Sequence, residues 1–140
     1  MKILIRAVGR LRDRRMEELC REYLDRARRH LPVEVNEVAE DGALVAKLPP
    51  GTEIIALEPG GDSWNTAQLT AHVQAGMVEG KKAIAFLIGA ADGLPAEVVK
   101  ASHRRLSLSP LTLPHRLARV ILCEQIYRAL SIIRGEPYGR

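Results

Sequence analysis

The chain alternates short apolar runs with longer segments in which apolar residues recur every three or four positions. The first pattern is typical of strands and the second of amphipathic helices. Four runs predict strands, at residues 2–8, 33–38, 53–57 and 83–88. The last run is apolar throughout, as in a central parallel strand that is covered on both faces. Strands that alternate with helices predict a three-layer α/β domain, in which a mainly parallel sheet carries helices on both faces.

Two helices are predicted between these strands, and both have recognisable start signals. Asp13 is a good N-cap for the first helix. Its apolar stripe consists of Met16, Leu19, Cys20, Tyr23, Leu24 and Ala27. The second helix begins after Ser63 or Asn65, of which Asn65 forms a capping-box pattern with Gln68, and it ends at Gly80. His72 lies beside the apolar stripe of this helix and is interpreted as a partly buried helix residue.

A long helix is predicted near the end of the chain. Pro114 suits its first turn, because the proline ring fixes φ and the missing N–H has no partner there in any case. The apolar-rich run from Arg116 to Ile133 contains no Gly or Pro, and Gly135 then ends the helix. At 100° per residue, one apolar face faces the sheet and consists of Ala118, Leu122, Ile126, Ala129, Leu130 and Ile133.

The same helix carries a second set of apolar residues, which point away from that face. They are Leu117, Val120, Ile121, Tyr127 and Ile132. This is more apolar surface than a helix packed on one side needs, so a second packing partner is expected. We expect that partner to be the same helix of another copy, across a two-fold axis. The pair Glu124 and Arg128, four residues apart, is interpreted as support for the helix rather than as catalytic chemistry.

Three loops follow predicted strands, at residues 57–61, 89–93 and 106–114. In parallel α/β sheets, ligands bind at the carboxyl ends of strands. The first two loops contain glycines that let a ligand approach the backbone, and the third contains hydroxyl groups close to the start of the last helix. We therefore expect the ligand site at these loops. The connection at residues 40–51 contains two prolines and has room for at most one helical turn.

Length and composition favour one domain at residues 1–140. No apolar run reaches 18 residues, so we predict no membrane span, no signal peptide and a cytoplasmic location. The net charge of +4 is unevenly distributed along the chain. Residues 1–30 carry ten Lys and Arg and five acidic residues, and residues 100–140 carry eight Lys and Arg and two acidic residues. Residues 31–99 are acidic, with three Lys and Arg and ten acidic residues. Two basic segments fit an anionic partner such as RNA, although a solvated helix face explains the first segment equally well.

Several other chemistries lack their motifs. The loop at residues 89–93 has neither the P-loop nor the dinucleotide-binding glycine pattern, which argues against a nucleotide triphosphate or dinucleotide site. Ser107 and Ser109 are not in a G-x-S-x-G elbow. The four histidines have no spacing suited to a metal, so no metal is predicted. Cys20 and Cys123 each fall in a predicted helix and are expected to be buried, reduced thiols.

The segment LSLSPLTLPHRLARVILCEQIYRALSIIRGEPY resembles the C-terminal signature of the knotted, SPOUT-class methyltransferases. Within that class it is most similar to the small bacterial enzymes that methylate N3 of a pseudouridine in 23S ribosomal RNA. The resemblance extends through FLIGAADGL, LEPG and the opening KILIRAVG, so it covers essentially the whole chain. LTLPH followed by EQIYRA is the specific part of this signal, whereas the glycine-containing loop alone is weak.

The resemblance implies a C-terminal trefoil knot, a homodimer with each active site near the subunit boundary, and S-adenosylmethionine as cofactor. It implies that the substrate is ribosomal RNA, and the absence of an appended RNA-binding domain leads us to expect recognition on assembled ribosomes. Carried over residue by residue, the resemblance implies cofactor contacts from Leu57, Gly89, Leu108, Ser109, Pro110, Leu111, Thr112 and Leu113.

The resemblance also implies that the C-terminal tail reaches the catalytic pocket. Tyr138 is then a candidate for packing on or hydrogen-bonding the target base, and Arg140 for holding an RNA phosphate or base oxygen. His115 and Arg119 are the next candidates, although His115 is equally explained as a helix-capping residue. The family usually ends in Pro-Tyr-His-Lys or Pro-Tyr-His-Arg, whereas this chain has Gly139 at the histidine position.

Two alternatives to an active ribosomal RNA methyltransferase remain open from the sequence. The missing histidine fits a ribosome-associated RNA-binding protein of the same fold that is catalytically impaired. A knotted methyltransferase that acts on transfer RNA is the second alternative. Ala90-Ala91-Asp92 replaces the more usual Gly-Pro-Glu, and Asp92 then either contacts substrate or holds its loop.

Overall fold

A parallel sheet of five strands, in the order β2-β1-β4-β3-β5, forms the centre of the molecule. In the computed structural model, which describes residues 1–139, every strand pair is parallel. The strands are β1 (Lys2–Val8), β2 (Val33–Val38), β3 (Thr52–Ser63), β4 (Ala83–Ile88) and β5 (Arg104–Ser107). The helices are α1 (Arg14–Ala27), α2 (Thr66–Val78), α3 (Ala96–Ala101) and α4 (His115–Ile133), with short 3₁₀ helices η1 (Asp41–Val45) and η2 (Pro137–Gly139).

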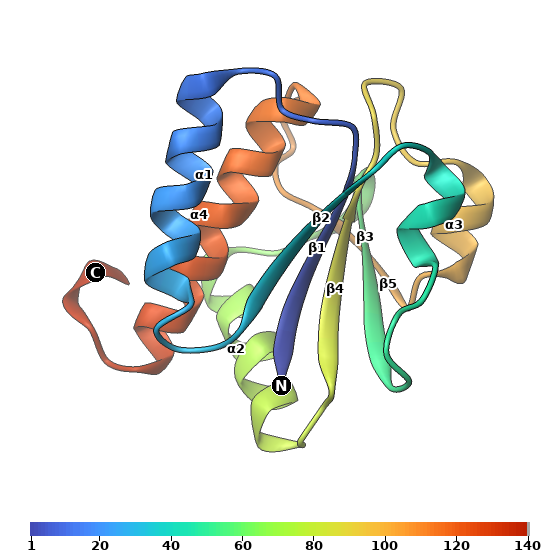
Figure 1. Cartoon of the computed structure of the whole chain (residues 1–140). Helices are drawn as coiled ribbons and strands as arrows, with labels where there is room; N and C mark the ends of the chain where they lie inside the picture. Colours follow the sequence, from blue (N-terminus) through green and yellow to red (C-terminus); the bar gives the residue numbers. More distant parts are fainter. Residues whose placement is uncertain (140) are drawn as a thin grey trace.

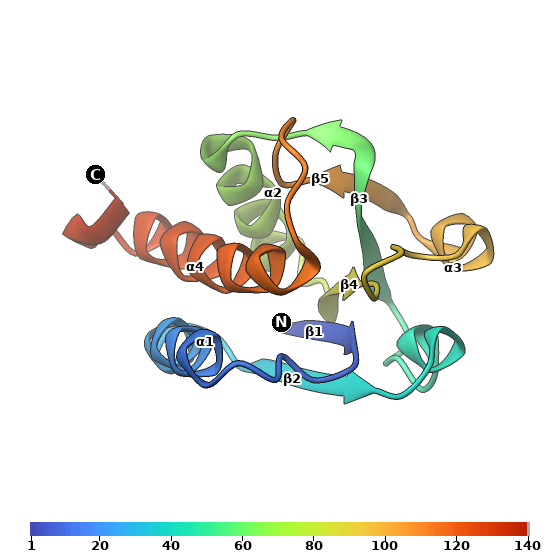
Figure 2. The same cartoon turned by 90° about the horizontal axis from the view of Figure 1, so that it is seen from above.

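The helices cover both faces of the sheet, so the predicted three-layer α/β architecture is confirmed. Helices α1, α4 and α2 lie on one face, and α3 and η1 lie on the other (Figures 1 and 2). All six residues of β4 are buried, as expected for a central strand between two layers. The largest fully buried side chains include Phe86 and Ile84 of β4, Ile3 and Ile5 of β1, and Leu122 of α4. Removing each from water stabilises the fold by about 1.5–3 kcal/mol.

The predicted helix boundaries are confirmed by their caps. The Asp13 carboxylate accepts hydrogen bonds from the backbone N–H groups of Arg15 (3.0 Å) and Met16 (3.2 Å). Asn65 and Gln68 form a reciprocal capping box, with both hydrogen bonds at 2.8 Å. The last helix starts directly after Pro114 and ends at Ile133.

The structure differs from the sequence-based prediction at β3, which continues past Leu57 to Ser63 with a shift in its pairing to β5 between Leu57 and Asp62. A Cβ atom at Gly61 would lie 2.6 Å from the backbone of Arg105, so only glycine lets the two strands approach this closely. Helix α3 was not predicted, because only one of its six residues, Val98, is buried and so short a helix shows no periodicity.

The second apolar face of α4 is partly covered by the chain itself. Val120 and Tyr127 are buried, because α1 packs against this side of α4, and the rings of Tyr23 and Tyr127 have centroids 6.4 Å apart. The prediction that another copy covers these two residues is therefore wrong. Leu117 and Ile132 remain 38% exposed. Within residues 1–139, none of the helices has the length and apolar character needed to cross a membrane.

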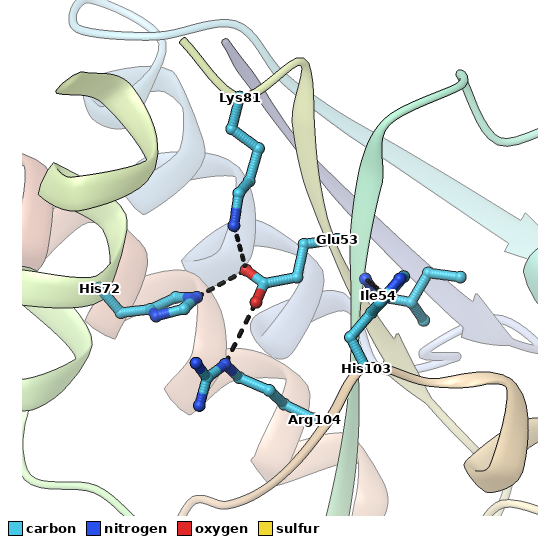
Figure 3. Close-up of polar contacts among 6 residues, drawn as sticks. All are labelled: Glu53, Ile54, His72, Lys81, His103 and Arg104. Atoms are coloured by element: carbon cyan, nitrogen blue, oxygen red, sulfur yellow. Dashed lines mark hydrogen bonds and ion pairs between the residues drawn. The ribbon is translucent and has the colours of Figure 1, made fainter. Parts of the chain in front are cut away.

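A polar network around Glu53 of β3 links edge strand β5 to β3 and α2 (Figure 3). One Glu53 oxygen lies 2.6 Å from Nε2 of His72 and 3.1 Å from Nζ of Lys81, and the other accepts a hydrogen bond from Arg104 at 3.1 Å. His103, the residue before β5, exchanges two hydrogen bonds with the backbone of Ile54. His72 is thus a partly buried helix residue, as predicted, and the network joins α2, β3 and β5.

Candidate active site

A pocket at the carboxyl ends of β3, β4 and β5 has a volume of about 300 Å³. Its walls are the three loops that the sequence indicated, together with the first turn of α4. The lining residues are Leu57, Glu58, Pro59, Ile88, Gly89, Ala90, Ala91, Asp92, Gly93, Ser107, Leu108, Ser109, Leu111, Thr112, Leu113, His115 and Ala118. Three segments that are far apart in sequence thus form one concave site.

The loop after β4 is held in a tight conformation by its two glycines. Gly93 has a φ of +84°, and its N–H donates to the carbonyl of Ala90 at 2.9 Å. A Cβ atom at Gly89 would lie 2.5 Å from the backbone carbon of Gly93, which leaves no room for a side chain. The loop therefore folds back on itself at the edge of the pocket.

The loop after β5 uses its hydroxyl groups to shape its own backbone. Ser107 Oγ donates to the carbonyl of Ser109 at 2.9 Å, and Ser109 Oγ accepts from the N–H of Leu111 at 2.9 Å. These contacts turn the chain between β5 and α4, where residues 108–114 have no helix or strand. Leu111 is 76% exposed at the pocket, so a large apolar side chain stands at its opening. An apolar ligand group that covers Leu111 gains the free energy of removing this surface from water.

Seven of the eight residues predicted to contact a cofactor line this pocket, and Pro110 does not. The structure brings the seven together, while their binding role stays a prediction. Ile88, Ser107, Ala118 and Glu58 also line the pocket but were not predicted individually. Ile88 and Ala118 carry no chemical signal. Ser107 and Glu58 lie in two of the predicted loops, but their sequence positions did not rank them above the other hydroxyls and acids.

Glu58 is the residue of the pocket whose polar atoms are least satisfied. Its Oε2 atom is buried and has no hydrogen-bond partner, and its Oε1 atom lies 3.8 Å from Nη1 of Arg105, beyond hydrogen-bonding distance. The second carboxylate at the pocket, Asp92, is exposed to solvent. Glu58 is therefore a half-buried lining residue with one buried oxygen that accepts no hydrogen bond.

Two of the four predicted catalytic residues lie at or behind the pocket. His115, the first residue of α4, lines the pocket. Arg119, one turn later, is buried and its guanidinium is engaged internally, with Glu37 Oε2 at 2.5 Å and the carbonyl of Gly9 at 3.4 Å. Arg119 thereby joins the start of α4 to the ends of β1 and β2, and a catalytic role for it stays a prediction.

Tyr138 belongs to η2, the short segment that follows the carboxyl end of α4 (Figure 1), whereas His115 is at the start of α4. Its hydroxyl donates to Glu124 Oε2 at 2.7 Å, and its ring packs on Tyr127, with centroids 4.5 Å apart. Burial raises the pKa of Tyr138 to about 12, and the hydrogen bond to Glu124 adds to this shift. The pair of Glu124 and Arg128 forms as predicted, at 2.7 Å. Arg140, the fourth candidate, lies outside the described residues.

Basic side chains stand beside the pocket. A small cavity of about 10 Å³ shares Ile88, Gly89 and His115 with the main pocket and is also lined by Arg10 and Arg116, which are exposed. Within residues 1–139 no group of three or more His, Cys, Asp or Glu side chains is arranged to hold a metal ion. The buried thiols Cys20 and Cys123 are free, as predicted. The arrangement fits a small ligand with an apolar part, next to a surface that attracts anions.

The chain has been compared with protein families and known proteins. Residues 1–139 match the family model described as "Predicted SPOUT methyltransferase". A protein from Sorangium cellulosum named "Ribosomal RNA large subunit methyltransferase H" is 44% identical, and the match covers 99% of each chain. Proteins of the same name from Anaeromyxobacter dehalogenans and Gemmatimonas aurantiaca are 40% and 38% identical, and each match covers 100% of both chains.

Solved structures share the fold at low sequence identity. A putative methyltransferase from Legionella pneumophila, solved in complex with bound SAM, has a TM-score of 0.53 and 14% identity, and the match covers 92% of this chain and 66% of that chain. TrmJ from Z. mobilis has a TM-score of 0.55 and 12% identity, with 91% and 68% covered. Because both the family model and relatives of 38–44% identity match over essentially the whole chain, the chain belongs to the SPOUT methyltransferase family.

Proposed function

We propose that this protein is an S-adenosylmethionine-dependent methyltransferase that methylates N3 of a pseudouridine in 23S ribosomal RNA. The observation that carries the proposal is the full-length similarity to relatives named as ribosomal RNA large subunit methyltransferases. The pocket adds independent support, because it unites the loops that the sequence indicated. We propose the cytoplasm as its location and an assembled ribosome as its substrate.

The pocket residues fit S-adenosylmethionine. Apolar side chains such as Leu57, Leu111 and Leu113 suit the faces of an adenine ring, and the carboxylate of Glu58, which accepts no hydrogen bond at Oε2, suits a hydrogen-bond donor once its side chain turns to the ligand. A carboxylate also suits a cationic ligand electrostatically. When bound, this cofactor supplies a methyl group activated by a positively charged sulfur. The loops of residues 89–93 and 107–113 bind and orient it, and they exclude water from its apolar parts.

The surface beside the pocket supports an RNA substrate. Arg10 and Arg116 flank the opening at His115, and they belong to the two basic segments of the chain. Phosphate groups of RNA are attracted to such side chains without sequence specificity, so recognition of one nucleotide has to come from the pocket and the ribosomal context. N3 must lose its proton for methyl transfer, and His115 is the imidazole side chain that lines the pocket.

We further propose a homodimer with a C-terminal knot, as the family resemblance implies. Within one chain Tyr138 packs on α4, away from the pocket, so its proposed role requires that the tail serve the pocket of a second copy. Leu117 and Ile132 of α4, each 38% exposed, support an interface on this helix. In such a dimer Tyr138 contacts the target base, Arg140 holds an RNA phosphate or base oxygen, and Arg119 positions the start of α4.

The test is methyl transfer from labelled S-adenosylmethionine to ribosomes from cells that lack this protein. We expect label in 23S RNA of assembled ribosomes, at one pseudouridine, and much less on naked RNA. Arg140→Ala should lose transfer, and Arg134→Ala, which changes the same charge near the tail, serves as its control. Transfer to naked RNA but not to ribosomes would contradict the proposed substrate.

The catalytically impaired alternative rests on Gly139, which stands where the family usually has histidine. If the protein binds both S-adenosylmethionine and ribosomes but transfers no methyl group, the RNA-binding alternative replaces the proposal. Label in transfer RNA rather than in ribosomal RNA would instead support the second alternative. A Gly139→His variant distinguishes a missing catalytic group from a missing substrate, because only the former is rescued.

A further inference from the structure

The carboxylate of Glu58 is the one feature of the pocket that the protein itself leaves incomplete. Its Oε2 atom is buried and has no hydrogen-bond partner among the described residues, and Oε1 has only the 3.8 Å approach of Arg105 Nη1. An unsatisfied buried acceptor destabilises a folded chain, more so when it belongs to a charged group. Such a group is retained where a ligand supplies the missing donor.

Arg105 does not remove this deficit. Its side chain is half exposed, and its Nη2 atom donates to the carbonyl of Gly60 at 3.0 Å, which directs the guanidinium along the outside of the loop. The arginine therefore offsets part of the negative charge of Glu58 but leaves the buried oxygen without a donor. Glu58 also lines the pocket, but because Oε2 is buried the side chain has to turn before this oxygen reaches the free space.

The neighbouring walls limit what can approach Glu58. The loops on the other sides of the pocket contribute mainly apolar side chains and serine hydroxyls that bond within their own loop, together with the polar residues Asp92, Thr112 and His115. A ligand in this pocket thus lies beside two carboxylates, and Glu58 is the one with a buried oxygen that accepts no hydrogen bond. A hydroxyl or an ammonium group on an otherwise apolar ligand is the complementary chemistry.

We propose that Glu58 is the residue that recognises the cofactor's hydrogen-bond donors: its side chain turns into the pocket, and its carboxylate contacts a ribose hydroxyl or the α-ammonium group. This assignment rests on the proposed function, since it takes S-adenosylmethionine as the ligand. Glu58 is then a binding residue for the cofactor and not the proton acceptor for the RNA base. The carboxylate pairs with Arg105 in the free protein and turns its second oxygen to the cofactor.

The experiment measures binding by isothermal titration calorimetry with the full chain. Relative to wild type, Glu58→Ala should bind S-adenosylmethionine and S-adenosylhomocysteine about 10- to 100-fold more weakly, as expected for the loss of a hydrogen bond to a charged group. Glu58→Gln keeps one acceptor oxygen without the charge, so its affinity should lie between the two. Asp62→Ala removes the same charge from an exposed position of the same segment outside the pocket, and it should bind like wild type.

A third ligand separates the two donors. 5′-Methylthioadenosine has the ribose hydroxyls but lacks the ammonium group. If Glu58→Ala weakens its binding as well, the donor is a ribose hydroxyl; if only the two complete ligands are affected, the donor is the ammonium group. Either pattern supports recognition of the cofactor by Glu58.

Unfolding in urea without ligand distinguishes this role from a structural one. Because the removed oxygen has no partner, the midpoint of Glu58→Ala should equal or exceed that of wild type. A lower midpoint together with unchanged affinity would show a structural role and overturn the inference. Unchanged affinity with lost methyl transfer would make Glu58 a proton acceptor and overturn it too. Failure of the wild type to bind S-adenosylmethionine would instead contradict the proposed function.

Discussion

Replacing Glu53 by Gln tests whether the polar network around this residue stabilises the β5 edge of the sheet. The Glu53 side chain is only 11% exposed and contacts three cationic or protonatable groups, at 2.6 Å, 3.1 Å and 3.1 Å (Figure 3). Glutamine is nearly isosteric, but it is neutral, and its amide N–H₂ has to face one of these donors. The substitution therefore removes the charge interactions of the network but keeps the size and shape of the side chain.

The expected loss of stability follows from the exposure of the partners. Breaking a fully buried ion pair costs about 3–5 kcal/mol, whereas an exposed pair contributes about 0–1 kcal/mol. The side chains of His72, Lys81 and Arg104 are 15%, 23% and 45% exposed, so water can solvate part of the charge that Glu53 leaves. We therefore expect Glu53→Gln to lower the free energy of unfolding by about 2–3 kcal/mol, between these limits. The midpoint temperature should fall by roughly 5–10 °C.

The control is Glu34→Gln at the opposite edge of the sheet. Glu34 of β2 pairs with Lys2 at 2.8 Å, but their side chains are 53% and 36% exposed, so the loss should stay below about 1 kcal/mol. Urea unfolding of both variants gives the comparison. Equal losses in the two variants would refute the reasoning, because the difference between them is attributed to burial alone.

The pH dependence of the free energy of unfolding is a second test of the Glu53 network. Burial raises the pKa of Glu53, but hydrogen bonds from His72 and Lys81 outweigh it, so the net pKa lies below the ordinary value of 4.5. A carboxyl group with a lowered folded-state pKa contributes its full stability above the unfolded value and loses it as the pH falls through the folded one. The stability difference between wild type and Glu53→Gln should accordingly shrink below pH 4.5. A difference that stays constant down to acid pH would contradict this account.

Three further substitutions test other contacts. Gly89→Ala places a Cβ atom 2.5 Å from the backbone of Gly93, so it should distort the pocket loop and abolish ligand binding measured by calorimetry. Leu111→Ser should leave the urea midpoint nearly unchanged, because the side chain is 76% exposed, but should weaken ligand binding if Leu111 packs on the ligand. Tyr138→Phe should lower the free energy of unfolding by about 1 kcal/mol, because the hydrogen bond to Glu124 is lost. Since the pKa of Tyr138 is raised to about 12, this hydrogen bond contributes its full stability below pH 10 and loses it as the pH rises through 12.

Much of the fold could be predicted because the local and global signals agree. Asp13, Asn65 and Pro114 mark helix starts by their own chemistry, and the apolar run of β4 needs two covering layers. The strand order could not be predicted, since every predicted strand has the apolar character to pair with several others. The packing partner predicted for Tyr127, a second copy of the chain, was wrong for a related reason. Periodicity shows that a second face of α4 is apolar, but it does not show that α1 of the same chain covers this face.

The location of the candidate site was predictable, because it depends on where the parallel strands end. Loops after parallel strands meet at one edge of the sheet, which is why Leu57, Gly89 and Ser109 line one pocket. Glu58 could not be ranked above other acids, because its unsatisfied oxygen is a property of packing and not of sequence. Nor could the sequence show that Tyr138 rests on α4 of its own chain, since the resemblance describes where a tail functions and not where it packs in one copy.

Strand β5 connects the stability of the sheet edge with the pocket, although the Glu53 network does not line the pocket. The strand has four residues, pairs only with β3, and continues directly into the pocket wall at Ser107 and Leu108. A ligand that binds this wall therefore also stabilises the pairing of β5, and by linkage the network that holds β5 favours binding. Glu53→Gln should then weaken cofactor binding, whereas Glu34→Gln should not.

Amide hydrogen exchange measures this coupling directly. With S-adenosylmethionine present, those amides of β5 that donate hydrogen bonds to β3 should exchange more slowly, and the paired amides of β2, at the opposite edge, should be unaffected beyond the global change in stability. Glu53→Gln should raise the exchange rate of the same β5 amides in the free protein, because the edge strand opens more often when the Glu53 network is broken. If neither the ligand nor the substitution changes exchange in β5 relative to β2, the pocket wall and the sheet edge are independent, and the Glu53 network serves stability alone.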